Sequence, residues 1–270
     1  MKSTFKKILL TLSAVMLFAV VFCFNASAVA STGQCGMYND DTDTLDHVTW
    51  NYNNNTKSLV ISGSGAMKEY DGWDNYSPFY NDDIKTIVIE SGVTSIGSYA
   101  FYNCKSLESV TIGEGVKNIG DCAFRDCISL ESVTISKGVI NIGDHAFSGC
   151  SSIESIIIPD SVTSLNYGAF YDCISLKSVT IGNGVESISS HAFSGCSSLE
   201  NIRILNKNVD ISNFSISTNA VIHCYKNSTA HTYAVENKQW FILIDGTDEE
   251  NSYSGTFGNF SWKLDKKHIL

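Results

Sequence analysis

Hydrophobic residues return at a fixed interval of 23 positions between residues 84 and 205. One unit reads L-x-S-V-T-I-x-x-G-V-x-x-I-x-x-x-A-F-x-x-C-x-S, and its apolar positions do not fit the 3.6-residue period of a helix. The S-V-T-I stretch alternates polar and apolar residues and is rich in β-branched side chains, which predicts a short strand. A unit of this size cannot bury its apolar side alone. We therefore expect successive units to stack, with parallel strands about 4.8 Å apart.

These units resemble the BspA-like (bacterial surface antigen) subclass of leucine-rich repeats. The resemblance is carried by LESVTIGEGVKNIGDCAFRDCISL and its four near copies. It implies a leucine-rich repeat solenoid with short parallel β-strands on one face and irregular or short helical turns on the other. An N-terminal β cap and a C-terminal closing turn would cover the two ends of the stack.

A cysteine recurs with the repeat, at Cys104, Cys127, Cys150, Cys173 and Cys196. The resemblance places these side chains inward at a bend, where each S–H can bond a loop carbonyl. Stacked side chains point the same way, which disfavours disulfides, and five rungs cannot all pair. Four zinc ligands must converge on a point, and a nucleophile needs exposure and a base. The ladder is therefore predicted to consist of buried free thiols.

Beyond residue 30, three further cysteines lie outside the ladder. Cys35 and Cys224 fall in opposite caps, too far apart to pair. Cys122 belongs to a column of varied residues, which we interpret as a surface position; its other members are Tyr99, His145, Gly168 and His191. A Cys122–His145 dyad is a minor alternative to two unrelated surface residues.

We divide the chain into five segments: a signal peptide (1–30), an N-terminal cap module (31–83), the repeats (84–205), a C-terminal cap (206–245), and a linker with the start of a second, truncated cap-like module (246–270). HVTWNY and KSLVIS flank NNNT and predict a hairpin in the first cap. The residues expected to cover the first repeat are Trp50, Trp73, Phe79 and Tyr80. In the second cap, Asn227 or Ser228 is expected to begin a short helix.

The N-terminus predicts export. Three lysines precede an apolar run at 8–24, and small residues allow cleavage after Ala28 or Ala30. An uncleaved membrane anchor is the alternative, because the run is near spanning length. Cleavage would change the formal charge from −10 to −13, which disfavours nucleic acid as a partner. We expect a secreted or cell-surface monomer with no membrane insertion after cleavage.

The outward side of the strands is the candidate binding face. It combines hydroxyl-rich columns with an acidic stripe, in which stacked glutamates would repel unless a cation meets them. The residues of this face are Glu108, Ser109, Thr111, Glu131, Ser132, Thr134, Glu154, Ser155, Ile157, Ser178, Thr180 and Arg203. Alternatively, Ser and Thr merely suit exposed strands. A second contact patch is expected on the opposite edge, at Tyr99, Tyr102, Tyr167 and Tyr171.

We found no motif for a hydrolase, a metalloprotease, a phosphate loop or a paired C-x-x-C site. The expectation is a non-enzymatic binding or adhesion module without cofactor or metal. The resemblance implies partners among host or neighbouring-cell surface and matrix proteins, with glycans as a second class. A structural spacer arm and the non-catalytic part of a larger secreted hydrolase are the alternatives.

Overall fold

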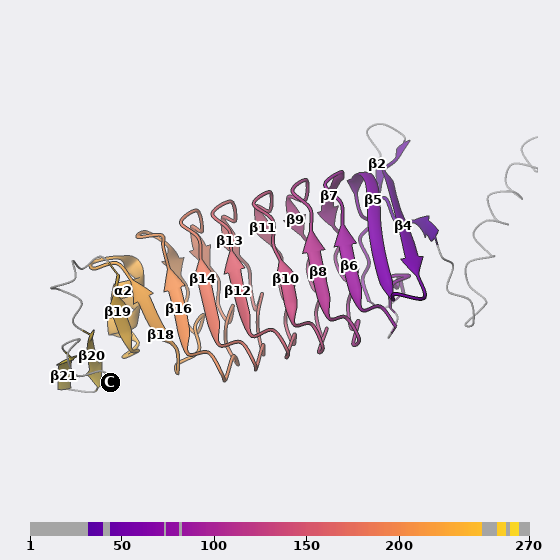
Figure 1. Cartoon of the computed structure of the whole chain (residues 1–270). Helices are drawn as coiled ribbons and strands as arrows, with labels where there is room; N and C mark the ends of the chain where they lie inside the picture. Colours follow the sequence, from indigo (N-terminus) through magenta and orange to yellow (C-terminus); the bar gives the residue numbers. More distant parts are fainter. Residues whose placement is uncertain are drawn as a thin grey trace, which may run out of the picture. The chain divides into compact units, whose positions relative to one another are not determined.

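The computed structural model describes residues 32–39, 44–72, 74–80, 83–244, 253–257 and 260–264. In this part of the chain about seven turns stack as a parallel β-solenoid (Figure 1). This arrangement confirms the fold expected from the repeats. The predicted signal peptide and Trp73 lie outside the described residues.

Each turn contributes one strand to a ladder of longer strands. These strands are β6 (Thr86–Ile89), β8 (Ser109–Ile112), β10 (Ser132–Thr134), β12 (Ser155–Ile158), β14 (Ser178–Ile181), β16 (Asn201–Ile204) and β18 (Val221–Cys224). Pairing follows the repeat, as with Val133 opposite Val110 and Thr180 opposite Ile157. The 23-residue interval therefore sets the register directly.

A second ladder runs along the next side of the coil. Its members are β7 (Val93–Ile96), β9 (Asn118–Ile119), β11 (Asn141–Ile142), β13 (Ser164–Leu165), β15 (Ser187–Ile188) and β17 (Asp210–Ile211). They are parallel and in register from turn to turn, as with Leu165 opposite Ile142. The sequence pattern predicted only one strand per unit, because a two-residue strand is too short to show alternation.

The long ladder is interrupted once. β8 pairs with β10 and β12 pairs with β14, but no residues of β10 and β12 pair with each other, although the whole segment is described. Gly182 and Leu205 donate backbone N–H groups to the preceding turn, to Ile158 and Ile181. Pro159 occupies the same column and has no N–H, so this bond cannot form at this turn.

The core consists of like residues stacked on like. Phe79, Phe101, Phe124, Phe147, Phe170 and Phe193 form one column with neighbouring ring centroids 5.1 to 5.4 Å apart. The columns of Leu107 and Ile119 are buried in the same way. A turn that cannot close its own core is thus closed by the turns on both sides.

The N-terminal cap is the predicted antiparallel hairpin. β4 (His47–Asn53) pairs with β5 (Ser58–Ala66) and with β1 (Thr32–Gln34), and β5 then begins both parallel ladders. A small pair, β2 (Tyr38–Asn39) and β3 (Thr44–Leu45), lies beside it in sequence. Trp50 packs edge-on against Phe79, 5.8 Å between centroids, which confirms their covering role. Tyr80 reaches the first repeat through its hydroxyl, which accepts a hydrogen bond from Asn103 Nδ2 at 2.8 Å, although 55% of the residue is exposed.

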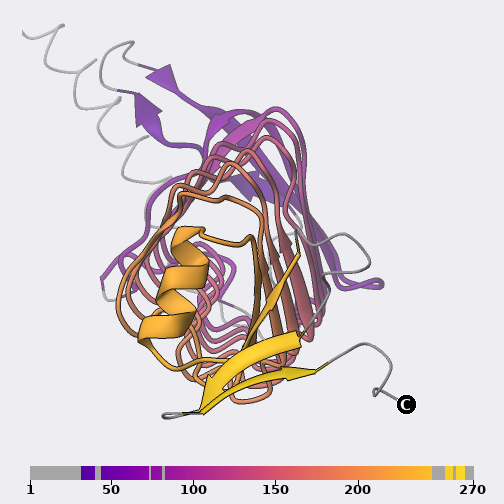
Figure 2. The same cartoon turned by 90° about the vertical axis from the view of Figure 1, so that its left-hand side faces the viewer.

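The C-terminal end carries α2 (Thr229–Glu236), which lies across the last turn in Figure 2. Ser228 is its N-cap and accepts from His231 N–H at 3.1 Å, so the second of the two predicted caps is correct. β19 (Phe241–Leu243) then pairs with β18. Beyond it, β20 (Tyr253–Phe257) and β21 (Phe260–Leu264) form an antiparallel pair. That a second module begins here stays a prediction.

Candidate binding surfaces

The predicted face lies on the outward side of the long strands. The burial patterns alternate as expected, with Val110 and Ile112 inward and Ser109 and Thr111 outward on β8. Register sets Ser132 beside Ser109 and Arg203 beside Thr180. The strand pairing under this face is interrupted between β10 and β12. Ile157 is its most exposed apolar side chain, at 70%.

The acidic stripe is partly compensated by the chain itself. Lys85 Nζ lies 2.6 Å from Glu108 Oε1, and Lys177 Nζ lies 2.9 Å from Glu154 Oε1. The repulsion expected from stacked glutamates is therefore relieved at both ends by lysines of neighbouring turns. Exposed pairs of this kind contribute only about 0–1 kcal/mol each, so they shape the charge of the surface more than its stability.

The cysteine ladder is buried, as predicted. All five thiols are reduced and fully inaccessible, and each S–H donates to a phenylalanine carbonyl of the preceding turn, at 3.1 to 3.2 Å. Burial raises the pKa of Cys127 and Cys150, which keeps them as thiols. The five thiols therefore stabilise the fold and are not accessible for a chemical reaction.

The expectation for Cys122 is wrong, because it is only 5% exposed. Burial is not a property of the whole column, because Phe214 in the same column is 72% exposed. Every member of its column has a left-handed φ, from 53° to 61°: Tyr99, Cys122, His145, Gly168, His191 and Phe214. The backbone N–H of Cys122 donates to Asp144 O of the next turn at 2.8 Å, which holds this conformation. Tyr99 and Arg125 are the groups whose pKa the Cys122 thiol raises, and His145 Nδ1 is buried without a hydrogen-bond partner, so the described chain shows no Cys122–His145 dyad.

Rings gather on the turn edge that follows this column. We call this group the turn-edge ring cluster: His145, Tyr167, Tyr171, His191 and Phe214. Tyr99 and Tyr102 form a separate pair, 5.8 Å between centroids. The expected tyrosine patch is thus two patches. The sequence signal for the turn-edge ring cluster was the pair Tyr167 and Tyr171. The next turn has Ser190 and Ser194 at the corresponding positions.

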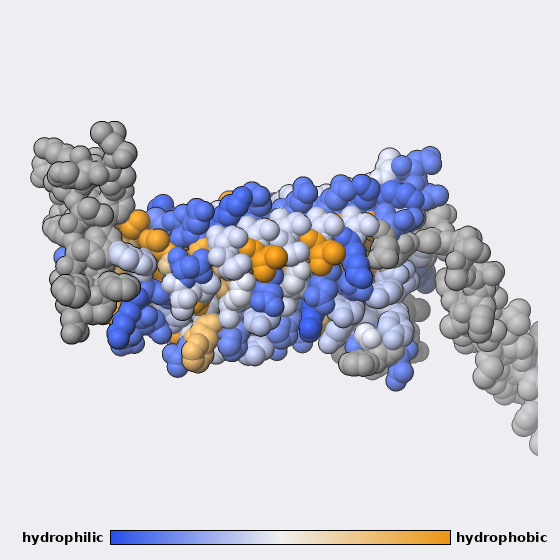
Figure 3. Space-filling model, turned by 90° about the horizontal axis from the view of Figure 1, so that it is seen from below, coloured by the Kyte–Doolittle hydropathy of each residue, from blue (hydrophilic) through white to orange (hydrophobic). Residues whose placement is uncertain are grey.

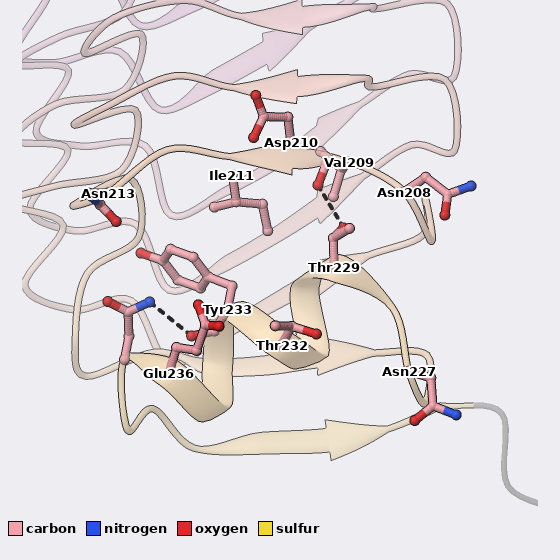
Figure 4. A pocket seen from close by; sticks show the side chains of 11 residues that line it. Asn208, Val209, Asp210, Ile211, Asn213, Asn227, Thr229, Thr232, Tyr233 and Glu236 are labelled. Atoms are coloured by element: carbon pink, nitrogen blue, oxygen red, sulfur yellow. Dashed lines mark hydrogen bonds between the residues drawn. The ribbon is translucent and has the colours of Figure 1, made fainter.

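A polar cavity of about 410 Å³ lies between β17 and α2 (Figure 4). Carboxylates, carboxamides and hydroxyls line it, among them Asp210, Asn213, Thr232, Tyr233 and Glu236. Several polar groups are already used: Thr229 Oγ1 donates to Val209 O at 2.6 Å, and Asn237 Nδ2 to Tyr233 O at 2.9 Å. The described lining is suited to hydrogen bonding.

Hydrophobic side chains occur as separate spots on the face seen in Figure 3, which is otherwise largely hydrophilic. In the part of the chain that the structure describes, no helix is long and apolar enough to cross a bilayer. Across the same residues, no three His, Cys, Asp or Glu side chains converge as metal ligands would.

Parallel turns with stacked leucine, phenylalanine and cysteine columns define the class of leucine-rich repeat solenoids. The family model of the BspA type leucine rich repeat region matches six copies, over residues 75–200 and 117–230. Together these matches span more than half of the chain. The chain belongs to the BspA type leucine-rich repeat family.

Three solved structures are similar to it. The pneumococcal vaccine antigen PcpA has a TM-score of 0.54 at 22% identity, covering 75% of this chain and 47% of its own. A leucine-rich repeat protein from Bacteroides ovatus has a TM-score of 0.51 at 28% identity, covering 66% and 52%. The T. pallidum leucine-rich repeat protein has a TM-score of 0.48 at 26% identity, covering 64% and 82%. The chain thus spans about half the length of the first two. No curated protein matches the sequence.

Proposed function

We propose that the chain is a non-enzymatic binding module, secreted or displayed on the cell surface, that attaches to proteins of a host or a neighbouring cell. The observation that carries the proposal is the outward face of the long strands. There the same side-chain columns repeat over successive turns above a closed core. A rigid surface of this kind suits recognition of a macromolecule, because little conformational entropy is lost on binding.

The predicted signal peptide and the family support an extracellular location. The hydroxyls on β8, β10, β12 and β14 supply hydrogen-bonding groups, and Ile157 supplies an apolar contact. The uneven charge of the acidic stripe adds selectivity, since Glu131 has no lysine within salt-bridge distance in the described chain. Surface and matrix proteins are the proposed partners, with glycans as the competing class.

The test is binding of the whole chain to a panel of immobilised matrix proteins and glycans, compared with the variant Thr134→Arg/Thr180→Arg. Arg203 occupies the same column, so the strands accommodate arginine there. Two added charges at an interface are expected to weaken binding by about tenfold or more, because unmatched charges must be desolvated. The matched control is Thr94→Lys/Thr163→Lys on the second ladder's side, in the column of Lys117.

Loss of binding in the first variant and retention in the control would support the strand face as the site. Equal binding by both would move the site elsewhere. Silence of the unmodified chain across the whole panel would contradict a binding role and favour a structural spacer.

A further inference from the structure

We propose that the turn-edge ring cluster binds a lysine or arginine side chain presented by a protein partner. This inference rests on the proposed function and assigns it a second contact surface with a defined chemistry. The cluster lies on the turns that join the two strand ladders, away from the strand-face columns already described.

Two tyrosines and two histidines form the centre of the cluster. The Tyr167 ring lies between two imidazoles, with centroid distances of 5.2 Å to His145 and 5.5 Å to His191. Tyr171 lies 6.4 Å from each imidazole. Both tyrosines are nearly perpendicular to the imidazoles, at 77° to 87°. Phe214 extends the row by stacking on His191 at 6.0 Å.

The backbone holds this frame in place. His145 and His191 have left-handed φ values of 53° and 61°, so their side chains leave the turn in the same way two units apart. Gly168 stands between them in the column. A Cβ at this glycine would come within 2.6 Å of the His145 ring, so the missing side chain makes room for the imidazole. The frame is therefore a product of packing between turns.

The rings remain open to solvent. Tyr167 is 46% exposed, Tyr171 36% and Phe214 72%. Exposed aromatic surface is costly in a soluble domain, and tyrosines of this kind are enriched in binding hot spots. The next turn has serine at both tyrosine positions, so the stack itself does not require these rings.

Charge selects a cation as the occupant. The groups that act on His145 are the carboxylates of Asp144, Asp121 and Asp126 and one guanidinium, Arg125. Burial, followed by Arg125, lowers the pKa of His145, so its ring is neutral near pH 7. The faces of neutral aromatic rings attract cations, and the formal charge of the chain, −10, draws them to the surface.

Contacts between a lysine ammonium group and a tyrosine ring occur elsewhere in the described chain. Lys68 Nζ lies 5.8 Å from the Tyr70 ring, and Lys207 Nζ lies 4.7 Å from the Tyr225 ring. The Tyr99–Tyr102 pair has Arg125 nearby, whose charge acts on Tyr99. In the described residues, the cation–ring contacts do not include Tyr167 or Tyr171, which are 46% and 36% exposed.

The experiment measures binding of a labelled peptide of alternating lysine and serine to the whole chain, by fluorescence anisotropy. A peptide with glutamine in place of lysine is the comparison. We expect Tyr167→Ser/Tyr171→Ser to raise the Kd for the lysine peptide about tenfold, from the loss of two ring contacts. Tyr167→Phe/Tyr171→Phe should bind like the unmodified chain, because the ring faces remain.

Tyr102→Ser is the matched control, since it removes a tyrosine from the Tyr171 column outside the cluster. The serine variant keeps the net charge, so nonspecific attraction to an acidic protein would leave its Kd unchanged. That result, or equal binding of the glutamine peptide, would overturn the inference. If the serine variant loses the peptide but still binds its panel protein, the cluster binds cations but is not essential for that partner. If the chain binds no matrix protein or glycan of the panel but the cluster still binds the lysine peptide, only the proposed function is contradicted.

Discussion

A ladder cysteine is a small side chain that satisfies a carbonyl inside a dry core. Cys150 Sγ donates to Phe124 O at 3.1 Å, and no solvent reaches either side chain. Residue type alone left disulfide, metal and nucleophile open. The 23-residue spacing predicted buried thiols, and the observed burial explains why they are unreactive, because a thiol without water favours its protonated form and has no route to a reagent.

Cys150→Ala is expected to lower the free energy of unfolding by about 1–3 kcal/mol, since it removes a buried hydrogen bond and leaves a small void. Urea denaturation measures the change. Ser151→Ala is the control, because Ser151 Oγ makes an exposed bond to Ile128 O of the preceding turn at 3.1 Å. Its cost should stay below about 0.5 kcal/mol. Equal losses in the two variants would show that burial of the thiol is not the deciding factor.

His145 should make stability depend on pH. Its pKa is lowered in the folded chain, mainly by burial and then by Arg125, from an ordinary value of 6.5. The folded state therefore takes up protons less readily than the unfolded state, and stability is lost as the pH falls from 6.5 through the folded pKa. The variant His145→Tyr should lose less stability between pH 7.5 and pH 5 than the unmodified chain does. Tyrosine suits this position, because Tyr99 occupies the same column. A steeper loss in the variant, measured by urea midpoints, would refute this assignment.

At the scale of elements, a proline follows the strand at which the long ladder is interrupted. The turn-to-turn N–H bond made by Gly182 and Leu205 is missing at Pro159, and β10 and β12 do not pair. The short ladder continues through the same turns, because β11 pairs with β13. The stack thus stays closed although the pairing of the long ladder is interrupted.

Pro159→Gly is expected to restore the missing donor, since glycine already occupies this column at Gly113 and Gly182. Hydrogen exchange provides the measurement. In the unmodified chain the amides of β12 should exchange faster than those of β14, and the substitution should slow them by about tenfold, the effect of roughly one additional hydrogen bond. Amides of β16, two turns away, are the internal reference. Unchanged exchange in β12 would mean that another feature separates the strands.

At the scale of the whole molecule, the stability of the stack and the proposed binding role rest on the same repetition. Each turn is closed by its neighbours, and the hairpin and α2 close the ends of the stack. The outward columns are then fixed at the strand spacing, about 4.8 Å, which leaves few side chains to order on binding. Tyr167, Tyr171 and Ile157 depart from the repeat and are exposed, so they are the positions at which the proposed function would acquire specificity.

The sequence by itself determined the fold class, the register, the buried ladder and the inward or outward direction of the strand side chains. A 23-residue period places like residues in contact whatever the details of the turn, so these features follow from spacing alone. The hairpin and the Ser228 cap were predictable because their signals are local.

Only the tertiary structure decided the burial of Cys122, the second strand ladder, the break at Pro159 and the frame of rings around Gly168. Each depends on bonds between turns, such as Cys122 N–H to Asp144 O, or on a side chain that fills space above another turn. A column of residues records which groups are neighbours. The sequence does not show the φ angles of these residues or the orientation of their side chains, because packing between turns determines both.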